Sequence, residues 1–229
     1  MPSEARLTTR PKSRSRGLKL NRLKFNDAQK YLGVIILLPI SPLMIEHRVI
    51  ERMIRITRLK LEEYKRTKEP NEKFVEALVD FIRIYADQNH HGKEEDILFR
   101  DLKKKQRSTE HKRIMNELIQ EHIIGRKTTS QLDAAKISYF SGEKEALNVI
   151  LERMDFLVTL YPKHIEKEDK HFFQPVMTYF SSEELDRMIE EEHAFDRKMI
   201  HRKYSQVVRG YEEEMKVTFS MSKNWLDYL

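Results

Sequence analysis

The chain has 229 residues, of which 35% are charged and 39% hydrophobic, with six glycines, seven prolines and no cysteine. This length is enough for one domain with a buried core, and the abundance of Glu, Lys, Leu, Ile, Met and Arg favours helices over strands. The lack of cysteine excludes disulfides, thiolate metal ligands and thiol nucleophiles from these residues, and it is typical of a reducing, cytoplasmic location.

The formal net charge of +6 is concentrated at the N-terminus. Residues 1–30 hold nine Lys or Arg and two acidic residues, whereas residues 31–229 carry a net charge of −1. We therefore predict that residues 1–38 form a basic, disordered extension. It is either a solvated or adventitious extension, one form of which places the true start of the protein near Met44 or just upstream, or a segment that weakly contacts nucleic acid or an anionic membrane. No specific nucleic-acid partner is expected.

The apolar run Tyr31–Ile40 does not predict a membrane helix. It is far shorter than the roughly 20 residues that a bilayer span requires, and it leads directly into the first helix that the pattern predicts. No membrane span is therefore expected.

Apolar residues at helical spacing predict four long helices, and a capping box at Ser181-Ser-Glu-Glu184 predicts a fifth. Glu69-Pro70-Asn71 separates the first two, and Ser108 is suited to cap the third. The fold class is therefore all-α, with a tail at residues 211–229. The expected helices begin and end near residues 42–68, 71–105, 108–139, 143 to beyond 168, and 181–214.

One ten-residue segment occurs twice. Residues 90–99, His-His-Gly-Lys-Glu-Glu-Asp-Ile-Leu-Phe, recur at 164–173 as His-Ile-Glu-Lys-Glu-Asp-Lys-His-Phe-Phe, with His, Lys, Glu and the closing Phe at the same offsets. Each copy contains His-x-x-x-Glu, and residues four apart lie on one face of a helix. Each copy can therefore direct an imidazole and a carboxylate at the same point.

A second pair of histidines precedes the two copies at nearly equal distances. His47 lies 43 residues before His90, His122 lies 42 residues before His164, and a Glu comes directly before each. The sequence therefore contains two similar halves. In each half, one predicted helix carries a His, and the next predicted helix carries a His and a Glu. The six candidate metal ligands are His47, His90, Glu94, His122, His164 and Glu168.

Helical periodicity separates these residues from their neighbours. The apolar stripe of the second helix continues into His90 and Glu94, which places His91 and Glu95 on the polar face beneath Asp87. We therefore expect His91 and Glu95 not to be ligands. Glu46 and Glu121 are expected to point outward, and Lys93, Lys167 and Arg126 to form solvated ion pairs. His171 is expected in the core or behind the ligands, and His193 and His201 at the surface.

Four imidazoles and two carboxylates inside a helical protein indicate a binuclear metal site. Buried carboxylates carry a heavy energetic penalty unless cations compensate them. We expect one metal ion near His47 and His90 and a second near His122 and His164, with Glu94 and Glu168 bridging the two. Nitrogen and oxygen ligands suit iron, manganese or zinc. A single His-x-x-x-Glu is more often a solvated pair, but two matched copies favour metal.

These motifs resemble the hemerythrin family, in its HHE cation-binding branch. The resemblance rests on Leu43–His47, Glu121-His122 and the two copies of the repeat, and it covers about residues 40–210. It implies an antiparallel four-helix bundle at residues 39–210 with an additional C-terminal helix. It also implies a non-haem centre of two iron ions with an oxo or hydroxo bridge, in which the four histidines are terminal ligands and Glu94 and Glu168 bridge.

The chain departs from the pattern of the oxygen-carrying members. Those have His-x-x-x-His on the third helix, whereas Leu118 and Arg126 stand four residues from His122 here. One ligand fewer leaves more open coordination positions, which puts simple oxygen carriage in doubt.

Three functions therefore stay open. The first is a protein that binds or senses oxygen, nitric oxide or peroxide. The second is an enzyme that repairs iron–sulfur clusters or consumes peroxide. The third is a metal-free helical interaction module with structural histidines. Whether the chain is an enzyme stays undecided at this stage.

Overall fold

The structure is a computed structural model that describes residues 38–215, with side chains to residue 199. All of them belong to one compact unit. Residues 1–37 of the extension predicted at 1–38 lie outside the described residues, as do the apolar run before Leu38 and the side chain of His201. Of the tail predicted at residues 211–229, residues 211–215 belong to the last helix and residues 216–229 lie outside the described residues.

Regular structure in residues 38–215 is entirely helical, which confirms the all-α prediction. None of the described helices is long and apolar enough to cross a membrane. The helices are α2 (Ile40–Thr67), α3 (Glu72–Asp80), η1 (Phe81–His91), η2 (Glu94–Phe99), α4 (Arg100–Leu102), α5 (Thr109–Phe140), α6 (Ala146–Lys167), η3 (Glu168–Phe172), α7 (Phe173–Met177) and α8 (Ser182–Met215).

Local capping explains where these helices begin. The Asn71 side chain accepts a hydrogen bond from the Phe74 backbone N–H at 2.9 Å, and Ser108 accepts one from the His111 N–H at 3.1 Å. At the start of α8, the Glu184 carboxylate accepts from the Ser181 N–H at 2.9 Å, as the capping box predicts. The helix bounds agree with the expected ones to within a few residues.

Three segments of the described chain are π-helical, with hydrogen bonds that reach one residue further than in an α-helix. The second long helix runs from α3 through η1 and η2 to α4, and η3 continues α6. His90 lies in η1, Glu94 in η2 and Glu168 in η3. Three of the six candidate ligands, including the glutamate of each half, therefore lie in π-helical segments.

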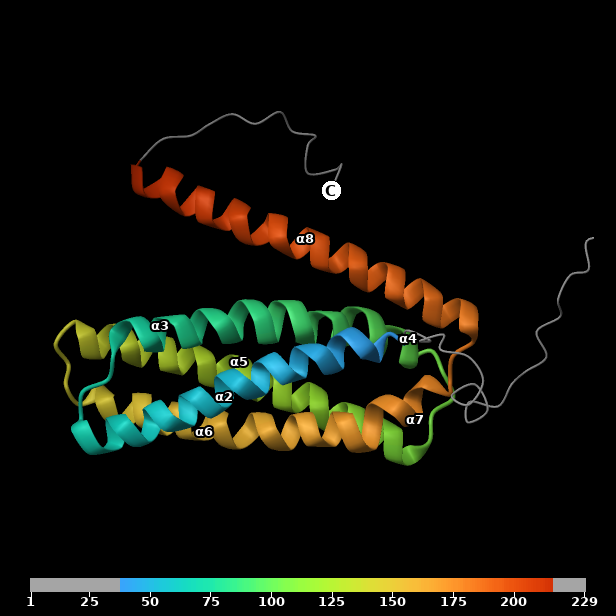
Figure 1. Cartoon of the computed structure of the whole chain (residues 1–229), viewed down its shortest axis with the longest axis horizontal. Helices are drawn as coiled ribbons and strands as arrows, with labels where there is room; N and C mark the ends of the chain where they lie inside the picture. The colour runs from blue at the N-terminus through green and yellow to red at the C-terminus, as the bar shows by residue number, and fades with distance from the viewer. Residues whose placement is uncertain (1–37, 216–229) are drawn as a thin grey trace, which may run out of the picture. The chain divides into compact units, whose positions relative to one another are not determined.

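α2, α3 with its continuation η1, α5 and α6 lie side by side, and α8 runs at an angle to them (Figure 1). α6 contacts α2 and α5, α3 contacts α5, and α8 contacts η1 and η2. Apolar side chains form two clusters, one around Ile50, Tyr64 and Leu157 and another around Phe99 and Phe172.

The candidate ligands lie between these two clusters. On α2, His47 stands between Leu43 of one cluster and Ile50 of the other. On α5, His122 likewise lies between Leu118, which belongs to the cluster of Phe99, and Leu132, which belongs to the cluster of Ile50. A polar layer therefore crosses an otherwise apolar interior.

Candidate metal centre

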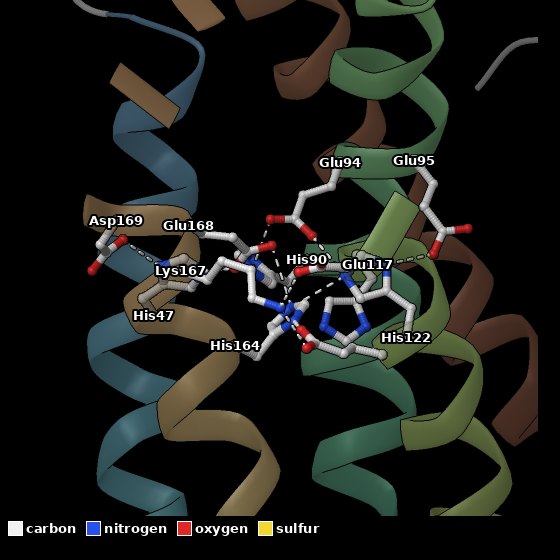
Figure 2. A network of polar contacts seen from close by, with 12 residues as sticks. His47, His90, Glu94, Glu95, Glu117, His122, His164, Lys167, Glu168 and Asp169 are labelled. Atoms are coloured by element: carbon white, nitrogen blue, oxygen red, sulfur yellow. Dashed lines mark hydrogen bonds and ion pairs between the residues drawn. The ribbon is translucent and has the colours of Figure 1, made fainter. Parts of the chain in front are cut away.

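The six candidate ligands come together from α2, η1, η2, α5, α6 and η3. Their side chains point toward a common centre between the helices (Figure 2). None of the six residues is more than 3% exposed to solvent. They are His47, His90, Glu94, His122, His164 and Glu168.

Each of the four imidazoles is held from outside by a carboxylate on another helix. A carboxylate only accepts hydrogen bonds when ionised, so the ring Nδ1–H is the donor in each pair. This fixes the tautomer and leaves the Nε2 lone pair facing the centre. The Nδ1-to-oxygen distances are 2.8 Å for His47–Asp169, 3.0 Å for His90–Glu46, 2.7 Å for His122–Glu95 and 2.8 Å for His164–Glu121.

A basic side chain neutralises each of these four acceptors, so the pattern is ring, carboxylate, cation in every case. The pKa values of all four acceptors lie below their usual range, because the hydrogen bonds and charges of their partners outweigh the effect of burial. The four carboxylates are therefore ionised. The ion pairs are Glu46–Lys93, Glu121–Lys167, Asp169–Arg48 and Glu95–Arg126.

The two inner carboxylates each reach both pairs of histidines. Glu94 places one oxygen 3.5 Å from His90 Nε2 and the other 3.3 Å from His122 Nε2. Glu168 places one oxygen 3.2 Å from His47 Nε2 and the other 3.2 Å from His164 Nε2. Each carboxylate therefore spans the two halves of the centre.

Among these inner atoms, Nε2 of His122 and Nε2 of His164 lie 3.2 Å from each other, and the others have no further polar partner within the described part of the chain. Both oxygens of Glu94 and Glu168 are buried without a hydrogen bond, and so are Nε2 of His47 and of His90. Their ion pairs are with histidines only, so no lysine or arginine balances the two carboxylates. Lone pairs facing carboxylate oxygens in a dry interior are unfavourable unless a cation lies between them.

Without a metal ion, protons take the place of that cation. Burial alone lowers the pKa of His47, but its contacts with Asp169 and Glu168 outweigh burial and raise the pKa to about 10. Burial also lowers the pKa of His122, and Glu94 and Glu95 raise it to about 9. Burial raises the pKa of Glu94, but the neighbouring histidines shift it well below its usual range. The cluster therefore attracts positive charge strongly.

Two overlapping groups have the geometry to hold an ion. In each group, one ligand atom per residue lies within 4.8 Å of all the others. Two atoms bound to one ion at about 2.1 Å are at most about 4.2 Å apart, so small side-chain movements suffice. The first group is His47, His90, Glu94 and Glu168, and the second is His91, Glu94, His122 and His164.

The structure corrects the placement of His91 and Glu95 on the polar face. His91 is only 4% exposed, and half-buried Glu95 accepts the hydrogen bond of His122. The prediction assumed an α-helical period, whereas η1 is π-helical. A π-helical turn holds more residues, so two consecutive side chains, His90 and His91, face inward.

Other expectations about neighbouring residues were also wrong. Glu46 and Glu121 do not point outward but hold the histidines of adjacent helices, and Lys93 is fully buried rather than solvated. His171 is exposed and not in the core, whereas His193 is exposed as expected. One signal was present in the sequence: each of the four Nδ1 acceptors stands directly beside a candidate ligand.

Comparisons with known proteins identified no relative. No protein-family model, no curated protein and no solved structure matches the chain. The family resemblance of the motifs therefore has no independent support, and the ligand roles of the six residues stay predictions.

Proposed function

We propose that this chain is a hemerythrin-like protein that holds two metal ions, most suitably iron, in an antiparallel four-helix bundle. The observation that carries the proposal is the position of Glu94 and Glu168, each with one oxygen toward either histidine pair. Bridging carboxylates need this placement. One ion would lie between His47 and His90, and the other between His122 and His164.

The surrounding residues suit this role. Each Nδ1–carboxylate hydrogen bond orients its ring and increases the basicity of Nε2, which strengthens metal binding. The carboxylates of Glu94 and Glu168 supply two negative charges that the described residues do not balance with Lys or Arg. Apolar residues above and below exclude water from the layer.

A centre of this kind binds small ligands at coordination positions that the protein leaves open. Bound iron supplies redox chemistry and a site for oxygen, nitric oxide or peroxide. The chain would contribute fixed ligand orientation and a dry pocket. We propose ligand binding or sensing as the function, with cluster repair or peroxide consumption as the enzymatic alternative.

Metal counting tests the proposal directly. Anaerobic loading with iron(II) should give two ions per chain, and brief exposure to oxygen, nitric oxide or peroxide should produce new visible absorption bands. Glu94→Gln and Glu168→Gln each remove a negative charge at nearly constant shape, so each should lower the number of bound metal ions per chain below two. Glu192→Gln is the matched control, because Glu192 is equally buried but belongs to neither group. Two bound ions per chain in the wild type and in all three variants would contradict the bridging roles.

The metal-free alternative has its own signature in the pH dependence of stability. If the histidines are structural, His47 and His122 act as imidazolium ions. Because their pKa values are raised to about 10 and about 9, their stabilisation is complete below about pH 6.5 and is lost as the pH rises through those values. The melting temperature of the chelated protein should therefore fall as the pH rises from 6.5 to 10. This alternative would be favoured if the chain is purified without metal and neither iron nor chelator changes its melting temperature.

A further inference from the structure

The two halves of the centre differ at one buried position. In the repeat, His90-His91 corresponds to His164-Ile165. Ile165 is 3% exposed and belongs to the apolar core, whereas His91 is 4% exposed and lies against the other histidines. A polar ring thus stands where the matching position has an aliphatic side chain.

His91 has both ring nitrogens buried without a hydrogen bond. Its ring stacks on His122 with 3.8 Å between centroids, and the His164 ring lies 5.5 Å away, nearly perpendicular. A buried polar group that makes no hydrogen bond costs free energy, so this position calls for a partner that the described residues do not provide.

The surroundings of His91 repeat the pattern of the four other rings. Its Nδ1 lies 3.5 Å from a carboxylate oxygen of Asp87, and Arg126 pairs with that carboxylate. The distance is longer than a good hydrogen bond, but the order of ring, carboxylate and cation is the same. Nδ1 therefore faces the carboxylate, which leaves Nε2 for the centre.

With Nδ1 directed at Asp87, Nε2 is the ring nitrogen available to a metal ion. The ligand atom of His91 lies within 4.8 Å of those of Glu94, His122 and His164.

We propose that His91 is a third histidine ligand of the metal ion held by His122 and His164. This inference rests on the proposed binuclear site and deepens it. The two ions then have unequal surroundings, one with three imidazoles and one with two, and a duplicated motif gives an asymmetric centre through a single residue.

The competing role for His91 is a packing ring. It also lies parallel to Tyr161, 6.3 Å away, so it could serve as an aromatic layer between Tyr161 and His122. A phenyl ring would satisfy that role, because it keeps the shape and removes only the nitrogens. His91→Phe therefore separates ligation from packing, and His91→Ile copies the residue of the other half.

Cobalt(II) titration followed by calorimetry and visible spectra is the first test. In both variants one of the two ions should bind at least tenfold more weakly, with changed spectra for that ion alone. His193→Phe, which alters an exposed histidine, should match the wild type. Two ions with unchanged affinities and spectra in His91→Phe would overturn the inference while leaving the binuclear site intact.

A measurement on the unmodified chain decides the question if both variants fail to fold. The wild type is labelled with ¹⁵N-histidine and loaded with ¹¹³Cd, and ring nitrogens coupled to cadmium are counted by NMR. We expect five. Four coupled nitrogens would overturn the role of His91 alone, and none would refute the metal site as well.

Discussion

The two halves of the centre use the same arrangement but are enclosed differently. Lys93 and Lys167 occupy the same place in the repeat, and each pairs with the carboxylate that holds the histidine of its own segment. Lys93 also bonds Asp196 of α8 and is fully buried, whereas Lys167 bonds Glu117 of α5 and its side chain is 23% exposed.

α8 is the source of this difference. It contacts η1 and η2 of the first half, and it brings Asp196 and buried Glu192 to that side. His90 and His164 are both buried, but the carboxylate and lysine that hold His90 are less exposed than those that hold His164. Duplication supplies the ligands, and the added helix makes the halves distinct.

The largest expected effect comes from removing the two lysines in turn. Lys93→Met leaves Glu46 without its cation in a buried network, which typically costs about 3–5 kcal/mol. Lys167→Met should cost about 1 kcal/mol or less, because water partly screens that pair. Urea unfolding of the metal-free proteins measures both. Equal losses would show that α8 does not distinguish the halves.

The next effect concerns pH and is specific to the half covered by α8. Burial raises the pKa of Glu192 to about 9, so the folded chain retains a proton that the unfolded chain releases near pH 4.5. The contribution of protonated Glu192 to the free energy of unfolding is complete below pH 4.5. It falls as the pH rises toward 9, by at most about 1.4 kcal/mol per pH unit.

Glu192→Gln should remove that slope, because the amide does not titrate. Denaturant unfolding at a series of pH values between 5 and 9 measures it, and Glu190→Gln, at an exposed position of the same helix, is the control. An unchanged slope in Glu192→Gln would mean that Glu192 is ionised in the folded chain.

Much of the site follows from local spacing, and the remainder depends on packing. His90–Glu94 and His164–Glu168 could be predicted because four-residue spacing acts within one helix. The partner of His47 could not, because Asp169 is 122 residues away in the sequence. His91 was misplaced because sequence periodicity does not reveal a π-helical stretch.

The packing of α8 against η1 and η2 also could not be predicted from the sequence, for a physical reason. The helix was predicted from its capping box, but its docking face depends on contacts such as that of Phe195 with Gly92, which only the folded chain brings together. The stripe of Leu185, Met188, Phe195 and Met199 shows which face of α8 is buried, but a stripe alone does not specify the neighbour that it packs against.

The smallest effect tests this docking through two helical glycines. A Cβ at Gly92 would lie 2.7 Å from Cζ of Phe195 on α8, so Gly92→Ala must displace that ring. A Cβ at Gly125, on α5, would lie 3.8 Å from the nearest atom of Leu160, an ordinary contact.

The two substitutions should therefore differ in sign. Ala in place of Gly favours a helix by about 1 kcal/mol, so Gly125→Ala should be neutral or stabilising by up to that amount. At Gly92 the overlap outweighs this gain, and a net loss of about 1 kcal/mol is expected. Urea midpoints of the metal-free proteins report both changes. Stabilisation by Gly92→Ala would mean that α8 does not press against the helix at His90 and His91, and the tighter enclosure of the first half would then have to come from Lys93 and its carboxylates alone.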